Sequence, residues 1–208
     1  MNDRGDFDQL HAWRNRPLCR KYVGAIFRSA VAAVRDRGNL FDMHIYWGLG
    51  CHVDGGFELL GTWLQKDCDA AFPAAKLSEL HDRGVDDIGL LACVSGLSVP
   101  SPPPREAEVR CRRVVFVSEA VSTGSTQLSD VRPAVHRLVL AGELRAQHIQ
   151  RRLTSALTRR DCFDDATAAL NCVAAHLMRV ERRFHQTSTR GTLAWEQRAS
   201  ASAVGAAL

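Results

Sequence analysis

The residues from Met43 to Ser95 decide the fold of this chain, and they read MHIYWGLGCHVDGGFELLGTWLQKDCDAAFPAAKLSELHDRGVDDIGLLACVS. Apolar residues alternate with other residues from Met43 to Leu49, a period of two that predicts a β-strand. Asp54-Gly55 supplies the residue types that accept a positive φ in a tight turn. The segment from Phe57 to Gln65 then predicts a partner strand, so this part of the chain forms an antiparallel hairpin.

The second part of the stretch changes to a helical period. Phe72, Leu77 and Leu80 share one stripe of a helix over Lys66 to Arg83, and Gly84 follows in the position that commonly ends a helix. Ile88 to Val94 is a short, continuous apolar run, which is typical of a strand buried on both faces of a sheet. A hairpin, a crossover helix and a buried strand predict an α/β fold with a mixed sheet.

The residues before this stretch predict one helix and one further strand. The segment 1–22 begins with a helical pattern that stops at Arg16-Pro17. Gly24 to Arg35 is expected to be the first strand, followed by a turn at Asp36 to Asn39. Its many alanines are poor strand formers, so a helix remains an alternative there.

The residues after the stretch predict a loop, a strand and helices. A proline-rich segment, 98–106, interrupts all periodicity, Val109 to Val117 is a strand candidate, and 118–131 is loop-like. Helices are expected over 133–160, with Gly142 as a possible interruption, and over 164–184. The predicted organisation is an entry helix and linker (1–22), a core (23–117) and a basic, mainly helical C-terminal region (118–208).

Composition narrows the class of protein. The chain has 208 residues, of which 46% are hydrophobic, enough for one ordinary core. It has no apolar run of membrane-spanning length and no secretory signal pattern, so we expect a cytoplasmic protein without a membrane partner. Its seven cysteines are scattered without paired spacing, which predicts reduced thiols and no zinc site.

The formal charge of +4 is unevenly distributed. From Arg105 onward, 16 arginines stand against 10 acidic residues, so this half is the better place for an acidic partner. An alternative is a general preference for arginine, which outnumbers lysine 24 to 3 throughout the chain. The DNA-binding candidates are the paired arginines Arg151, Arg152, Arg159, Arg160, Arg182 and Arg183.

The order of short motifs between Ala12 and Leu97 resembles the core of the mutator-type transposases of bacterial insertion sequences. That resemblance implies an α/β fold of the ribonuclease H kind, with flanking helices and a helical C-terminal part. It also implies DNA transposition as the ancestral activity. The motifs that carry it are Gly48-Leu49-Gly50, Asp54-Gly55, Leu60-Gly61-Thr62-Trp63, Asp67 to Phe72 and Arg83-Gly84-Val85.

The resemblance also implies catalytic positions. Members of this family use two aspartates and one glutamate to hold two divalent metal ions, Mg²⁺ as a rule, for strand cleavage and transfer. The aspartate positions fall on Arg28 and Ser95 here, so both aspartates are lost. Glu181 is the candidate glutamate, although a second register puts that position at Leu177.

We therefore expect a degenerate transposase that does not bind Mg²⁺. Its expected partners are DNA at transposon ends, and a second copy of itself or an intact transposase. One alternative is a remnant that only binds DNA or protein, and another is an unrelated small α/β binding module. The unrelated module would be preferred if Met43 to Ser95 did not form a sheet, a helix and a strand in that order.

Overall fold

The computed structural model describes residues 3–65, 72–94, 109–111, 114–117 and 133–184. Within them, six strands form one mixed sheet in the order β3-β2-β1-β4-β5, and β6 also pairs with β4. β1, β2 and β3 are antiparallel neighbours, whereas β4 is parallel to β1, β5 and β6. The strands are β1 (Lys21–Asp36), β2 (Asn39–Cys51), β3 (Phe57–Gln65), β4 (Asp87–Val94), β5 (Arg110–Cys111) and β6 (Val114–Val117).

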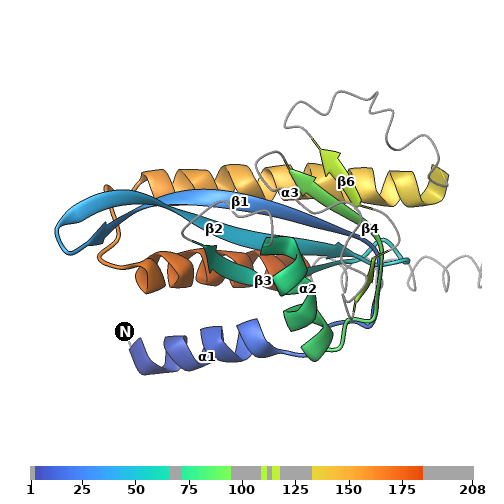
Figure 1. Ribbon diagram of the computed structural model, residues 1–208, viewed down its shortest axis with the longest axis horizontal. Helices are drawn as coiled ribbons and strands as arrows, with labels where there is room; N and C mark the ends of the chain where they lie inside the picture. Colours follow the sequence, from blue (N-terminus) through green and yellow to red (C-terminus); the bar gives the residue numbers. More distant parts are fainter. Residues whose placement is uncertain (1–2, 66–71, 95–108, 112–113, 118–132, 185–208) are drawn as a thin grey trace, which may run out of the picture.

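β1 and β2 form a long hairpin that projects beyond the rest of the sheet (Figure 1). Their pairing runs without interruption from Gly24 opposite Cys51 to Asp36 opposite Asn39. Arg37 and Gly38 have positive φ angles of 50° and 87°, which close the predicted turn. The strand prediction for β1 is thus confirmed, because pairing along its length outweighs the weak strand propensity of its alanines.

The predicted hairpin between β2 and β3 is also confirmed. The backbone N–H of Gly56 donates a hydrogen bond to Asp54 Oδ1 at 2.9 Å, and Gly55 has a φ of 85°. Helix α2 (Phe72–Asp82) is followed by a turn in which Gly84 has a φ of 100°. β4 follows as the predicted buried strand, so the expected sheet, helix and strand occur in that order.

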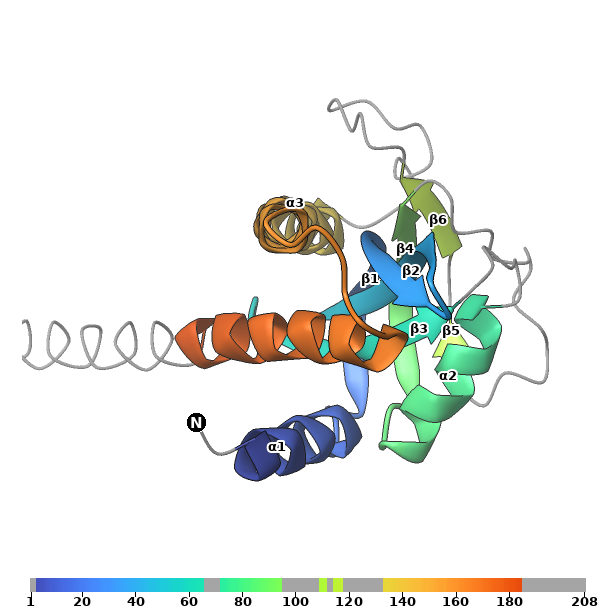
Figure 2. The same ribbon diagram turned by 90° about the vertical axis from the view of Figure 1, so that its left-hand side faces the viewer.

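Helices lie on both faces of the sheet. α3 (Pro133–Thr158) and the helix of residues 166–184 cover one face, and α2 lies on the opposite side (Figure 2). α1 (Asp3–Asn15) lies next to the helix 166–184 and contributes Leu10 and Trp13 to the core on that side. The chain is therefore a three-layer α/β structure, as the sequence predicts at this level.

The predicted interruption at Gly142 is wrong, because α3 is one continuous helix of 26 residues. Gly142 instead allows a close approach between α3 and the sheet. A Cβ atom at this position would lie 2.5 Å from Cys51 Sγ and 3.0 Å from Ile26 Cδ1. The glycine is therefore a packing residue in the helix and not a break.

Two apolar cores lie on the two faces of the sheet. The larger one joins the sheet to α1, α3 and the helix 166–184, and Trp47 is its largest fully buried side chain. The smaller one joins the sheet to α2 through Phe27, Leu77 and Leu80. The sequence signal for both was the alternation along the strands.

The proline-rich loop 98–106, the loop 118–131 and the C-terminal tail lie outside the described residues, as does the start of the helix predicted from Lys66. Among the helices that the structure describes, none is both long enough and apolar enough to cross a membrane.

Candidate functional site

A buried ion pair joins β1 to α3 where the family resemblance expects the first metal-binding aspartate. Arg28 Nη2 on β1 donates to Glu143 Oε1 on α3. Both side chains are only 6% exposed. A cation and its counter-ion therefore fill this position between strand and helix.

The surroundings of the Arg28–Glu143 pair do not supply a hydrogen-bond partner for every polar atom of the two side chains. Gln147 Nε2 also donates to Glu143 Oε1, at 3.1 Å. Arg28 Nε and Glu143 Oε2 are buried and have no hydrogen-bond partner among the described residues. Burial first, and the charge of Glu143 second, raise the pKa of the nearby Cys51 thiol to about 12.

Gln150 fixes α3 against the same strands one helical turn further on. Trp47 Nε1 donates to Gln150 Oε1 at 2.9 Å, and Gln150 Nε2 donates to the carbonyl oxygen of Ser29 at 2.8 Å. Arg28 and Trp47 are cross-strand partners in β1 and β2. These contacts hold the helix in register, so the Arg28–Glu143 pair is a fixed part of the interface.

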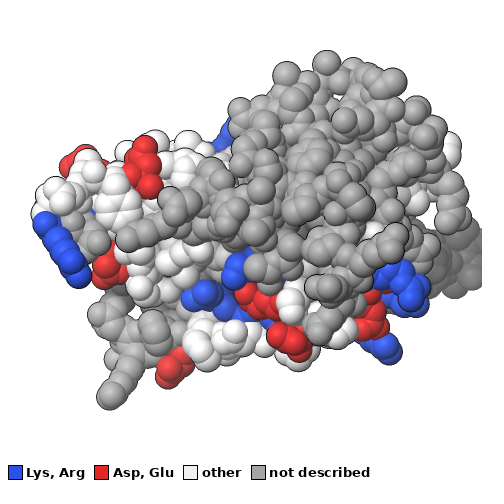
Figure 3. Space-filling model, viewed as in Figure 1, with Lys and Arg blue, Asp and Glu red and all other residues white. Residues whose placement is uncertain are grey.

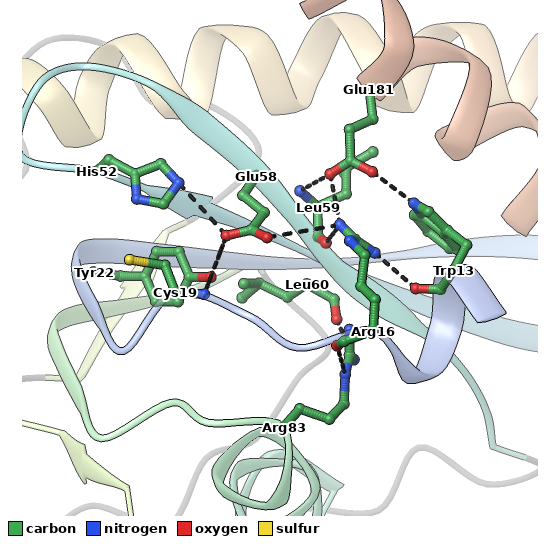
Figure 4. Close-up of polar contacts among 10 residues, drawn as sticks. All are labelled: Trp13, Arg16, Cys19, Tyr22, His52, Glu58, Leu59, Leu60, Arg83 and Glu181. Atoms are coloured by element: carbon green, nitrogen blue, oxygen red, sulfur yellow. Dashed lines mark hydrogen bonds and ion pairs between the residues drawn. The ribbon is translucent and has the colours of Figure 1, made fainter. Parts of the chain in front are cut away.

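Glu181, the candidate glutamate, lies at another place in the fold. It accepts hydrogen bonds from Trp13 Nε1 at 2.6 Å, from Arg16 Nη2 at 2.6 Å and from the backbone N–H of Leu59 at 3.0 Å (Figure 4). Both of its carboxylate oxygens are thus used. Glu181 ties the helix 166–184 to α1 and to β3.

Two arginines satisfy the backbone of β3 next to Glu181. Arg16 Nη2 donates to the carbonyl oxygen of Leu59 at 2.7 Å, and Arg83 Nη1 donates to that of Leu60 at 2.5 Å (Figure 4). Burial, and then the charge of Arg16, lower the pKa of the Arg83 guanidinium. The geometry of this network indicates a structural role, because Glu181, Arg16 and Arg83 each contact the backbone of β3.

A second carboxylate, Glu58, lies beside this network. Its Oε2 accepts a hydrogen bond from the Tyr22 hydroxyl at 2.6 Å and lies 3.6 Å from His52 Nε2 (Figure 4). Burial, with the contribution of Glu58, raises the pKa of the Tyr22 phenol far above its usual range. The tyrosine therefore stays protonated and serves as a hydrogen-bond donor.

The positions expected for metal ligands do not fit a divalent cation where the structure describes them. Mg²⁺ needs free oxygen ligands, whereas Arg28 is a cation and the oxygens of Glu181 are occupied. Arg28 and Leu59, the backbone partner of Glu181, lie on β1 and β3 with β2 between them. In the described part of the chain, no group of three or more His, Cys, Asp or Glu side chains could hold a metal ion.

Ser95 and Leu177 are the remaining positions at which metal ligands were expected. Ser95 lies outside the described residues, and Leu177, the alternative position for the glutamate, is a fully buried core residue. The structure brings no two of Arg28, Ser95 and Glu181 into described contact. Sequence reasoning missed Glu143, although an acidic residue inside the apolar stripe of α3 was a usable signal.

The six predicted DNA-binding arginines come from α3, from the residues directly after it and from the helix 166–184. Arg151 and Arg152 lie in α3, and Arg159 and Arg160 follow its last residue, Thr158. Arg160 lies over the ring of Phe163, with Cζ 5.2 Å from the centroid. Arg182 contacts Gln9 of α1, with 3.3 Å between Nη2 and Oε1. On the face drawn in Figure 3, described basic and acidic residues are intermixed and form no continuous basic surface.

Comparisons with known proteins agree on one family. Residues 4–100 match the sequence profile described as "Transposase, Mutator family". The chain is 36% identical over 85 residues to a protein named as transposase for insertion sequence element ISRM3 from Rhizobium meliloti, covering 41% of this chain and 21% of that protein. A probable insertion-sequence transposase from Corynebacterium diphtheriae is 27% identical over 86 residues, which cover 41% of this chain and 25% of the relative.

The chain spans about a fifth to a quarter of the length of these relatives. The alternative of an unrelated α/β binding module is wrong, because both the family match and the observed order of hairpin, helix and strand contradict it. Residues 4–100, a little under half of the chain, are therefore similar to the Mutator family of transposases, and this part of the chain resembles insertion-sequence transposases.

Proposed function

We propose that this chain is a transposase-derived protein with a ribonuclease H-like core that binds DNA but does not carry out metal-dependent strand cleavage. The proposed absence of strand cleavage rests on one observation. The position expected for the first metal-binding aspartate holds Arg28, in a buried ion pair with Glu143. A guanidinium at this place would repel a divalent cation, and it also binds Oε1 of the carboxylate opposite it.

The state of Glu181 supports the same proposal. Its oxygens accept three hydrogen bonds, and a metal ion would have to displace Trp13, Arg16 or the backbone of β3 to reach them. Each displaced donor would be left buried or partly buried at a cost of about 1–3 kcal/mol. Glu181 is thus better suited to hold the fold together than to hold Mg²⁺.

The DNA part of the proposal rests on the family and on the arginines of the C-terminal helices. The relatives are named as transposases for insertion sequences, and arginine pairs well with phosphate. Transposon ends are the proposed DNA, and a second copy or an intact transposase is the proposed protein partner. A cytoplasmic location belongs to the same proposal.

Cleavage is tested by incubating the full chain with supercoiled plasmid and Mg²⁺ or Mn²⁺, alongside calorimetric titration of each metal. We expect neither nicking nor metal binding. Metal-dependent nicking that disappears in Glu181→Gln would contradict the proposal, since that substitution keeps the side-chain shape and one acceptor oxygen. The matched control is Glu79→Gln on α2. If the wild type does nick the plasmid, this control should leave the nicking unchanged.

A further inference from the structure

The helix 166–184 crosses α3 on the same side of the sheet (Figure 2), and two cation–π contacts mark where the chain segments meet. Arg145 of α3 lies over the ring of Phe184, with Cζ 4.6 Å from the centroid, while Arg160 lies over Phe163 at the connection between the helices. Arg152 is two turns after Arg145, and His176 is about two turns before Phe184. Arg152 lies close enough to His176 for its charge to act on the imidazole.

Two more arginines of the helix 166–184 lie on the side that carries His176. Arg179 and Arg183 follow His176 at spacings of three and seven residues, which is one face of a helix. We call the four residues Arg152, His176, Arg179 and Arg183 the seam cluster. Its three arginines are exposed, and His176 is half-buried with an inaccessible Nε2.

The charges of the seam cluster act on one another. Burial first, and then the positive charges of Arg152, Arg179 and Arg183, lower the pKa of His176. These are the charged groups that face the imidazole from α3 and from its own helix. Arg152 and Arg179 form no ion pair with a carboxylate anywhere in the described residues.

We propose that the seam cluster is a phosphate-binding site for a nucleic-acid backbone, with Arg152, Arg179 and Arg183 contacting the phosphate and His176 lying beneath them. This inference rests on the DNA binding proposed above and locates it. Arginine presents a planar fork of donors that matches phosphate oxygens. The positive charges that lower the pKa of His176 would be stabilised by a bound anion.

The arginines along α3 favour a backbone over a single ion. Arg145 and Arg152 are seven residues apart on one side of α3, a spacing of about 10.5 Å, and Arg159 comes directly after the last residue of the helix, Thr158. The spacing of about 10.5 Å is about three times the distance of about 3.4 Å between charges on one nucleic-acid strand. A regularly charged polymer can therefore follow these arginines beyond the seam cluster.

The test compares Arg152→Gln/Arg179→Gln with the control Arg110→Gln/Arg137→Gln in the full chain. The control removes the same charge from exposed arginines of β5 and α3 outside the cluster. Binding to a short fluorescent DNA duplex is measured by anisotropy over a salt series. Losing two phosphate contacts should lower the salt slope by about 1.8 and weaken binding about 60-fold at 0.1 M salt, with little change in the control.

A second measurement follows the pKa of His176 by NMR with and without the duplex. A phosphate held by the three arginines stabilises the imidazolium, so the pKa should rise on binding in the wild type and not in Arg152→Gln/Arg179→Gln. A role of the cluster in folding alone would not move this value.

Three results would overturn the inference. Equal loss of binding in the seam and control variants would leave DNA binding standing but reject this site. Competition by polyglutamate as effective as that by DNA would assign the cluster to acidic peptides. A wild-type chain that does not bind the duplex would reject the site and the proposed DNA binding together, without bearing on the separate result for cleavage.

Discussion

Replacing Glu143 by leucine should strongly destabilise the fold. Arg28 would keep its charge at a position where the side chain is 6% exposed, with no counter-ion in reach. Removing one partner of a buried ion pair costs about 3–5 kcal/mol. Because a domain of ordinary stability has only about 5–15 kcal/mol in total, Glu143→Leu should unfold at a much lower urea concentration than the wild type.

Removing both charges should restore that stability. The wild-type pair leaves Arg28 Nε and Glu143 Oε2 buried without a partner, each at a cost of about 1–3 kcal/mol. The double variant Arg28→Met/Glu143→Leu removes both atoms and should be as stable as the wild type or up to about 4 kcal/mol more stable. The measurement is urea unfolding followed by tryptophan fluorescence, since Trp47 is fixed to α3 through Gln150.

The control is the same double-mutant cycle at Arg20 and Asp86, whose side chains are 80% and 37% exposed. That pair should show a coupling below about 1 kcal/mol. A wild-type unfolding midpoint for Glu143→Leu would refute a buried, paired Arg28. So would a double variant whose loss equals the sum of the two single losses.

Three further predictions concern packing, thiol reactivity and pH. Gly142→Ala should cost about 1–3 kcal/mol in urea unfolding, because its Cβ would lie 2.5 Å from Cys51 Sγ, and an unchanged midpoint would mean that α3 lies further from the sheet. At pH 8 a thiol reagent should modify the exposed Cys19 and spare the buried Cys51, whose pKa is raised to about 12; rapid modification of Cys51 in Cys19→Ser would contradict its burial. The pKa of His176 is lowered in the folded chain, so the unfolded chain binds more protons and the free energy of unfolding falls as the pH drops below about 6.5. This loss of stability in acid should be smaller in His176→Gln than in the wild type. An equal loss in both proteins would refute the lowered pKa of His176.

The sequence predicted the strands and helices well where one local pattern controls them. The alternation from Met43 to Leu49 and the turn at Asp54-Gly55 both appear in the structure as expected. β1 was less certain, since its alanines carry little strand signal and its state depends on pairing with β2. The sequence predicted a possible helix interruption at Gly142, because its packing role depends on Cys51, which is far away in the sequence.

The candidate site was less predictable because its contacts join distant parts of the chain. Arg28 and Glu143 are 115 positions apart, and Trp13 and Glu181 are 168 apart. An arginine inside an apolar strand and a glutamate inside an apolar helical stripe each indicate a buried partner. The sequence does not identify which residue that partner is. Only the packing of α3 on β1 identifies the pair.

β3 is the outermost strand on its side of the described sheet, and such an edge is a template onto which another chain can add a strand. The side chains of Glu181, Arg16 and Arg83 occupy the backbone groups of Leu59 and Leu60 that an incoming strand would need. Glu181 comes from a helix outside the residues that match the transposase family. The helix that carries Glu181 therefore helps to keep this edge from adding a strand of another chain, a structural role of Glu181 that is independent of any chemistry on DNA.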